Sequence, residues 1–242
     1  MSETSHETEG PTGVVLAGGY SRRFGERDKA LARLDGRPLL ARVVARLAEV
    51  ADRVVVNCRA DQREAFADAL DSSAGFDSAA TPVRFVADPV PDRGPLFGFR
   101  TALREVGTET CALAACDCPF LDPRLLSDLA ERLADDPDAD VAAVRTGDRL
   151  RPTQAVYRTA AARRACDALL DDGEGRLSAL FDRLDARVVP AEAVGGDAAR
   201  SLFDVDTPAD RERAAEMLDR ETSAERGDGT PREREPGVAA RR

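Results

Sequence analysis

The sequence predicts an α/β fold with a mainly parallel central sheet and helices on both faces. Short apolar runs alternate with amphipathic runs up to about residue 138, the pattern of strands joined by crossover helices. The 242 residues, of which 43% are hydrophobic, suffice for one domain with a real core. Polar residues end several apolar runs, where a parallel sheet presents its ligand-binding side chains.

Four strand–helix pairs are expected in order along the first part of the chain. The expected strands are 13–17, 53–58, 83–88 and 111–117, and the expected helices are 38–50, 60–70, 95–106 and 122–134. The helix over 38–50 gathers its aliphatic residues on one face and has Pro38 in its first turn. The helix over 122–134 begins with Asp122 as N-cap and Pro123 as its first residue.

The pattern loosens after residue 138. "DVAAVRTGDRLRPTQAVYR" is expected to form two strands around a Gly-Asp turn, which adds antiparallel character. Two helices follow, then a strand at "ARVVPA" and a last helix after "FDVDTPAD". We therefore place the domain at 12–220. The segments 1–11 and 221–242 are predicted to be disordered, because they are polar or charged and lack apolar periodicity.

The charge of the chain argues against two classes of partner. With a net charge of −10 and a pI near 4.8, the surface should repel nucleic acid and anionic membrane. No run of 18 apolar residues predicts a transmembrane helix. The first residues, "MSETSHETEG", are polar and unlike a signal peptide, so a cytoplasmic protein is expected.

The cysteines and the histidine exclude further kinds of site. Five cysteines, an odd number without a Cys-x-x-Cys pair, argue against a disulfide framework and a structural zinc. We expect them to be packing residues. His6 is the only histidine and lies in the polar N-terminal segment, which argues against a histidine-based triad or metal site.

The glycine-rich stretch after the first strand is the first candidate for a binding site. A turn at Leu16–Gly19 would let backbone N–H groups approach phosphate oxygens. The next glycine, Gly25, does not fit a dinucleotide fingerprint, and a Walker loop is absent. What remains is a longer loop with Arg22, Arg23 and Lys29, the only lysine of the chain. Three cations around a glycine turn suit a triphosphate.

Carboxylates at two other places are candidates for a metal site. Asp117 ends the strand "CALAACD", where it would face the ligand crevice and could hold Mg²⁺; Asp122 already serves as the helix cap. In "FDVDTPAD", Asp204 or Asp206 could complete the metal site. Thr207 or Asp206 could equally cap the last helix.

The ordered set of these segments resembles a known family. "LAGGYSRRFGERDKALARLDGRPLL" is similar to the signature of nucleotidyltransferases with a Leu-Ala-Gly-Gly loop, in particular the molybdenum cofactor guanylyltransferases. The resemblance continues through "VVVNCR", "VADPVPDRGPLFG", "ACDCPFL", "RPTQAVYR" and "FDVDTPAD", and covers about 13–215. It implies a single Rossmann-like domain of the nucleotide-diphospho-sugar transferase type.

Carried over residue by residue, the resemblance implies the following nucleotide-binding residues: Leu16, Ala17, Gly18, Gly19, Lys29, Asn57, Asp88 and Asp117. The loop would use its backbone groups, and Lys29 would contact the phosphates. Asn57 and Asp88 would bind the guanosine part, and Asp117 would bind both GTP and Mg²⁺. "RPTQAVYR" would face the pterin.

The implied reaction joins molybdopterin phosphate to GTP and releases pyrophosphate. The attacking phosphate oxygen is already an anion, so no general base is required, in agreement with the lack of a suitable histidine. Catalysis then consists of alignment and charge neutralisation by Lys29, Arg23 and Asp117, with Mg²⁺ on Asp117 and Asp206. Without a clear apolar patch, a monomer is expected, in transient contact with other cofactor-synthesis proteins.

Several rival functions stay open. Many guanylyltransferases have Asn where this chain has Asp206, and "DxDTP" also occurs in related cytidylyltransferases. Other members of the superfamily act on sugar phosphates, methylerythritol phosphate or cobinamide phosphate. A non-catalytic nucleotide sensor or cofactor chaperone is a rival of a different class, against which the retention of Lys29 and Asp117 argues. A dehydrogenase is disfavoured by the glycine spacing.

Overall fold

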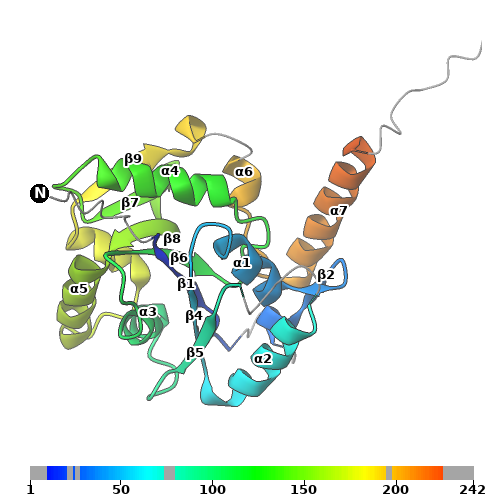
Figure 1. Cartoon of the computed structure of the whole chain (residues 1–242), viewed down its shortest axis with the longest axis horizontal. Helices are drawn as coiled ribbons and strands as arrows, with labels where there is room; N and C mark the ends of the chain where they lie inside the picture. The colour runs from blue at the N-terminus through cyan, green and yellow to red at the C-terminus, as the bar shows by residue number, and fades with distance from the viewer. Residues whose placement is uncertain (1–9, 21–23, 25–27, 74–79, 195–197, 226–242) are drawn as a thin grey trace, which may run out of the picture.

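A seven-stranded sheet forms the centre of the molecule (Figure 1). The computed structural model describes residues 10–20, 24, 28–73, 80–194 and 198–225. The sheet has the strand order β5-β4-β1-β6-β8-β7-β9. Its strands are β1 (Thr12–Leu16), β4 (Val54–Cys58), β5 (Val83–Ala87), β6 (Thr110–Ala115), β7 (Val141–Thr146), β8 (Arg149–Arg158) and β9 (Ala186–Pro190). The expected α/β fold is confirmed.

The sheet has a parallel half and a mixed half. Strands β5, β4, β1 and β6 are all parallel, with β1 between β4 and β6. Strand β8 is antiparallel to both β6 and β7, while β9 runs parallel to β7. The antiparallel character expected after residue 138 is therefore present.

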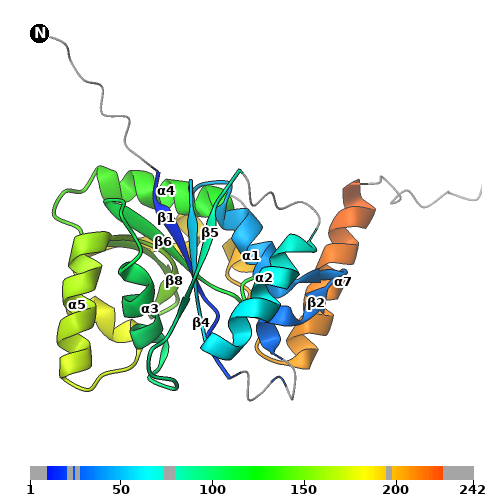
Figure 2. The same ribbon diagram turned by 60° about the horizontal axis from the view of Figure 1, so that its bottom comes forward.

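Helices cover both faces of the sheet (Figure 2). The α-helices are α1 (Leu39–Leu47), α2 (Arg63–Asp71), α3 (Pro95–Leu103), α4 (Pro123–Ala134), α5 (Thr159–Asp171), α6 (Ala198–Ser201) and α7 (Pro208–Glu225). The 3-10 helices are η1 (Lys29–Leu31), η2 (Ala60–Gln62), η3 (Leu177–Asp182) and η4 (Ala191–Ala193). Helices α1, α2 and α4 contribute to the core on one face, and α3 and α5 to the core on the other.

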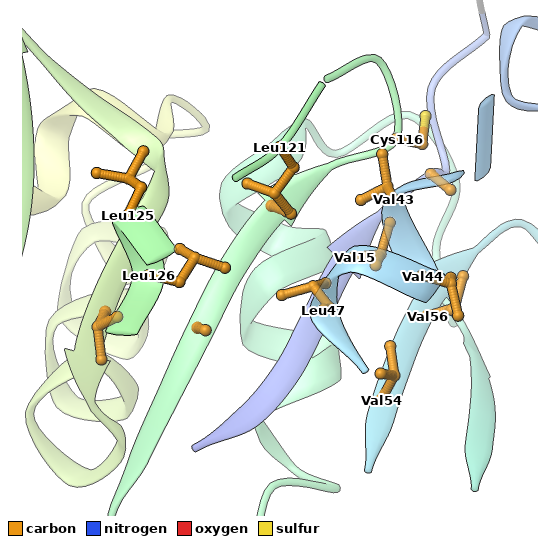
Figure 3. Packing of buried hydrophobic residues seen from close by; sticks show 14 of the residues in the cluster. Val15, Val43, Val44, Leu47, Val54, Val56, Cys116, Leu121, Leu125 and Leu126 are labelled. Carbon is orange, nitrogen blue, oxygen red and sulfur yellow. The ribbon is translucent and has the colours of Figure 1, made fainter. Parts of the chain in front are cut away.

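The two cores follow from the alternation of side chains along each strand. Val15 and Val56 point to the core beneath α1, where they pack with Val43 and Leu47 of that helix (Figure 3). Val14 belongs to the opposite core. Both faces of the central strands are therefore buried, which explains why these strands read as unbroken apolar runs.

A few elements differ from the expectation. Pro38 ends the short strand β3 (Arg37–Pro38) and is the N-cap of α1, not part of its first turn. Strand β3 pairs with β2 (Arg33–Leu34) in a hairpin that was not predicted, although its turn residues Asp35 and Gly36, both at positive φ, form a recognised hairpin signal. Two-residue strands are too short to produce a hydrophobic alternation.

The end of the chain also differs in detail. The second of the two helices expected before "ARVVPA" is the 3-10 helix η3. Helix α7 continues to Glu225, five residues past the expected domain end at 220. Strand β1 begins at Thr12, where the domain was expected to start. Residues 1–9 and 226–242 lie outside the described part of the chain.

The cysteines behave as packing residues. All five are buried and none forms a disulfide. Within the described ranges, no helix has both the length and the apolar character needed to cross a bilayer.

Candidate nucleotide site

A cavity of about 480 Å³ opens at the carboxyl edge of the parallel strands. We call it the nucleotide cavity. All eight residues that the resemblance implies as nucleotide-binding line this cavity. They are Leu16, Ala17, Gly18, Gly19, Lys29, Asn57, Asp88 and Asp117. The parallel register explains this convergence, since Leu16 lies beside Asn57 on one side and Ala115 on the other. Their individual roles stay predictions.

Lys29 is fixed at the cavity wall between two carboxylates. It is the first residue of η1, which Asp28 caps by accepting a hydrogen bond from Ala30 N. Lys29 Nζ donates to Asp117 Oδ2 at 2.7 Å and to Asp206 Oδ1 at 2.9 Å, and its side chain is 14% exposed. Burial alone would lower the pKa of Lys29, but the charge of Asp117 and the two hydrogen bonds together raise it. Lys29 is therefore a cation at neutral pH.

Asn57 and Asp88 form a hydrogen-bonded pair in the cavity wall. Asn57 Nδ2 donates to Asp88 Oδ1 at 2.8 Å, and Asn57 is buried. Burial raises the pKa of Asp88, while hydrogen bonds from Asn57 and Thr101 partly offset that effect. A Cβ at Gly98 would clash with the amide oxygen of Asn57, so Gly98 is required for this packing. A glycine inside the helical pattern "PLFGF" was a signal for such a close approach.

Asp117 belongs to a second group of polar side chains. Candidate ligand atoms of Asp117, Cys118 and Asp204 all lie within 4.8 Å of one another. Cys118 Sγ donates to Asp204 Oδ1 at 3.2 Å, and Asp204 also accepts from Arg151 at 2.7 Å. Burial and the neighbouring carboxylates hold the pKa of Cys118 well above its ordinary value, so this residue is a neutral thiol. The two carboxylates fit Mg²⁺, which prefers oxygen ligands, whereas the thiol does not.

The expectation that Asp206 is a metal ligand stays a prediction. Asp206 is 54% exposed and contacts Lys29, while Asp204 is the carboxylate grouped with Asp117. The cap of α7 is Thr207, because its Oγ1 accepts from Asp210 N at 3.2 Å and Asp210 accepts in turn from Thr207 N. Of the two alternatives left open for capping, the structure selects Thr207.

The segment "RPTQAVYR" contributes one residue to the cavity wall, Thr153. The side chain of Arg151 is held by Asp204 and by the carbonyl of Leu202. Gln154 is fully buried at a positive φ of 58° and donates to the carbonyl of Ser201. The assignment of this segment to the pterin side stays a prediction.

Sequence reasoning missed other residues of the cavity wall. Asp92, Arg93 and Gly94 reach it from the loop before α3, and Tyr20 from the segment after the glycines. Gly94 has a φ of 83°, and a Cβ there would lie 2.9 Å from the carbonyl oxygen of Gly175. The turn signal "PDRGP" pointed to a tight loop, but nothing local showed which cavity it borders.

Two candidates cannot be placed. Arg22 and Arg23, expected to contact phosphates, lie outside the described residues. Arg93 is a described arginine of the cavity wall and so adds a cation to Lys29.

Comparison with known proteins gives one family. Residues 13–188 match the MobA-like NTP transferase domain. A probable molybdenum cofactor guanylyltransferase from Natronomonas pharaonis is 43% identical over 208 residues, which cover 86% of this chain and 98% of that protein. A second protein with that description, from Haloferax mediterranei, is 37% identical over 80% of this chain and 87% of its own length.

Solved structures share the fold. The molybdopterin-guanine dinucleotide biosynthesis protein A from Archaeoglobus fulgidus matches with a TM-score of 0.69 and 24% identity, over 86% of this chain and 99% of that one. A nucleotidyl transferase from Methanothermobacter matches with a TM-score of 0.68 and 20% identity, over 88% and 99%. At these identities the likeness is one of architecture.

Proposed function

The chain belongs to the MobA-like NTP transferase family, and on that premise we propose that it transfers GMP from GTP to the phosphate of molybdopterin. Pyrophosphate is released and molybdopterin guanine dinucleotide is formed. The observation that carries the proposal is the convergence of all the predicted nucleotide-binding residues on one cavity at the carboxyl edge of the sheet. The names of the relatives support guanosine as the nucleoside.

The transfer is an in-line displacement at the α-phosphorus of GTP. An oxygen of the pterin phosphate forms the new P–O bond, while the bond between the α-phosphorus and the bridging oxygen breaks and its electron pair leaves with pyrophosphate. The nucleophile is an anion at neutral pH, so no side chain has to remove a proton. Lys29 would be a poor base in any case, because the raised pKa keeps it protonated.

The contribution of the protein is alignment and charge neutralisation. We assign Lys29 to the phosphates, since its ammonium group lies at the cavity wall and is oriented by Asp117 and Asp206. Arg93 is a second cation on that wall. Arg23, which lies outside the described residues, stays a candidate from the sequence. Such preorganised charges stabilise the transition state by about 2–4 kcal/mol each.

Asp117 is the residue that we propose as a Mg²⁺ ligand. Its Oδ2 accepts from Lys29, and its Oδ1 accepts a longer contact of 3.6 Å from Cys118 Sγ. Asp204 is near enough to provide a second carboxylate. When bound, Mg²⁺ supplies positive charge to the phosphate oxygens. Asp206 accepts a hydrogen bond from Lys29 Nζ, so we assign Asp206 to orienting the ammonium group.

We propose that the buried pair of Asn57 and Asp88 binds the guanosine part. A carboxylate acceptor held by an amide suits the N–H groups on the edge of guanine. Gly18 lies close to this pair, since a Cβ there would be 3.3 Å from Asn57 Oδ1 and 3.5 Å from Asp88 Oδ2. Asp206 contacts Lys29 and is not among the residues that line the cavity. The difference at Asp206 that raised cytidine as an alternative therefore lies away from the proposed nucleoside pocket.

Pyrophosphate release tests the proposal. The purified chain is mixed with molybdopterin, Mg²⁺ and either GTP, CTP, ATP or UTP, with Lys29→Ala as the inactive control. Release with GTP alone supports a guanylyltransferase. Release with CTP assigns a cytidylyltransferase, and tight binding of GTP without release indicates a sensor or cofactor chaperone.

We further propose a cytoplasmic monomer in transient contact with other cofactor-synthesis proteins. The strongly acidic charge disfavours stable self-association through like-charged surfaces. Sedimentation of the purified chain tests the oligomeric state, and a stable dimer at low concentration would contradict it.

A further inference from the structure

The first turn after β4 reaches across to the segment that carries the glycines. Arg59 and Gln62 belong to this turn, and both contact the two stretches that flank the undescribed residues of the loop, namely Ala17–Tyr20 and Asp28–Lys29. Neither Arg59 nor Gln62 lines the nucleotide cavity. These contacts therefore come from behind the loop.

Gln62 links three parts of the chain with one buried amide. Its Nε2 donates to the carbonyl of Ala17 at 3.3 Å and to the carboxylate of Asp28, and its Oε1 accepts from Arg59 N at 2.7 Å. Gln62 is only 4% exposed. A buried amide with all these partners satisfied fixes the separation between the two stretches of the loop.

Arg59 holds the glycines themselves. Its Nη1 donates to the carbonyl of Gly19 at 2.9 Å and, more weakly, to that of Gly18 at 3.4 Å. The guanidinium group also lies 3.6 Å from Asp28 and stacks over the ring of Tyr20, 4.6 Å from its centroid. The Arg59 side chain is 16% exposed, and its Nε and Nη2 also donate to the exposed carboxylate of Asp61.

The direction of those carbonyls has a consequence for the opposite side of the loop. In a trans peptide the C=O of one residue and the N–H of the next point in opposite directions. With the carbonyls of Gly18 and Gly19 directed to Arg59, the N–H groups of Gly19 and Tyr20 are directed away from it. Gly19 and Tyr20 both line the nucleotide cavity, so a phosphate bound there would meet this stretch of backbone on the side away from Arg59.

We infer that Arg59, Gln62 and Asp28 form a clamp that positions Ala17–Tyr20 and Lys29 for the phosphates of a nucleoside triphosphate. We call these three residues the loop clamp. They are positioning residues, because they act through the backbone of Gly19 and Tyr20 and through Lys29, the neighbour of Asp28. This assignment depends on the proposed function only for the identity of the ligand, a nucleoside triphosphate.

The test compares a ligand that has phosphates with one that lacks them. Binding of GTP and of guanosine is measured by calorimetry for the unchanged chain, for Arg59→Ala and for Arg63→Ala, a matched control at an exposed arginine in the next turn. Arg59→Ala should weaken GTP binding about tenfold or more, the size expected for lost charge-assisted hydrogen bonds, and leave guanosine binding unchanged. Arg63→Ala should leave both unchanged.

Two results would overturn the loop clamp. One is unchanged GTP affinity in Arg59→Ala, and the other is an equal loss of GTP and guanosine binding, which indicates general disruption of the cavity. Thermal unfolding is recorded for each variant. Should Arg59→Ala fail to fold, Arg59→Lys and Gln62→Met replace it, and each must lose GTP affinity while keeping guanosine affinity.

The same experiment separates this inference from the proposed function. If the chain binds CTP in place of GTP, guanylyl transfer is wrong, and the loop clamp is judged on CTP against cytidine. If GTP binds and no pyrophosphate is released, the proposed reaction fails while the comparison of affinities still decides on the clamp. If no triphosphate binds more tightly than its nucleoside, the loop clamp is wrong.

Discussion

Two hollows of the molecule differ in what their charged side chains are used for. The nucleotide cavity has a volume of about 480 Å³, and a second hollow, outside α1 and the start of α4, measures about 630 Å³. We call the second one the arginine groove. Its charged lining consists of Arg37, Arg42, Arg46, Glu49, Asp122, Arg124 and Arg200. It is the larger and the more cationic of the two.

Much of the charge in the arginine groove is already used within the chain. Arg42 donates twice to the carbonyl of Leu34, and Arg46 is paired with Glu49. Arg37 donates to the carbonyl of Ala41, and Arg200 lies over the ring of Phe120. These arginines hold helix ends and aromatic surface in place, as their long stems allow.

The nucleotide cavity combines fewer cations with a preorganised backbone. Lys29 is held by two carboxylates, and the glycine loop is held from behind by the loop clamp. Polar residues lie at the carboxyl ends of three of the four parallel strands, namely β4, β5 and β6. The proposed phosphate site of this chain is therefore indicated by converging strand ends and fixed donors, and not by the number of cations.

The largest effect is expected at Asp117, which both orients Lys29 and is the proposed metal ligand. Asp117→Ala should abolish Mg²⁺-dependent turnover, a loss of about a thousandfold or more. Pyrophosphate release is followed over a Mg²⁺ titration, with exposed Asp68→Ala as control. An unchanged dependence on Mg²⁺ would place the metal elsewhere.

Lys29→Ala should leave the fold intact and lower turnover by about a hundredfold or more, because one preorganised cation is lost. Lys29→Arg should recover only part of that loss, since a planar guanidinium does not replace a compact ammonium placed between two carboxylates. Steady-state kcat and the unfolding temperature are measured for both. Near-normal turnover of Lys29→Ala would remove the role given to this residue.

Asp88→Asn separates stability from binding. Burial raises the pKa of Asp88 in the folded chain. The folded state therefore holds its proton more tightly than the unfolded state does. As a result, the free energy of unfolding falls as the pH rises from the ordinary carboxyl pKa through the raised pKa. The substitution removes this effect, so the unfolding temperature at neutral pH should stay the same or rise. GTP affinity should fall about tenfold. A drop in stability at neutral pH with unchanged affinity would contradict both assignments.

The smallest effect is expected in the arginine groove. Arg46→Ala breaks an exposed pair with Glu49 and should change the free energy of unfolding by less than about 1 kcal/mol. Turnover should stay within about twofold of that of the unchanged chain, since a surface substitution away from the site has little effect. A loss of turnover comparable to that of Lys29→Ala would mean that the arginine groove is needed for activity as much as the nucleotide cavity is.

The cavity was predictable from the sequence because it depends on two regularities. Apolar runs identify the parallel strands, and parallel strands present the residues after them at one edge. Leu16, Asn57, Asp88 and Asp117 could therefore be placed together without knowing their contacts. Lys29 could be predicted as a functional residue because it is the only lysine in a chain that otherwise uses arginine.

The loop clamp could not be predicted in the same way. Gln62 lies 45 residues from Ala17 and 34 from Asp28, and neither partner leaves a trace in the local pattern. Gly98 is an intermediate case, because a glycine inside a helical pattern signals a close approach but does not show that Asn57 is the neighbour. Contacts of this kind depend on how strands and helices pack, which hydrophobic periodicity does not specify.

The proposed nucleotide site is tested most directly by an experimental structure of the chain with GTP and Mg²⁺. We expect the triphosphate to lie against the backbone of Leu16–Tyr20 and Lys29. Mg²⁺ should bind at Asp117, and the guanosine part at Asn57 and Asp88. A triphosphate bound in the arginine groove instead would contradict this assignment.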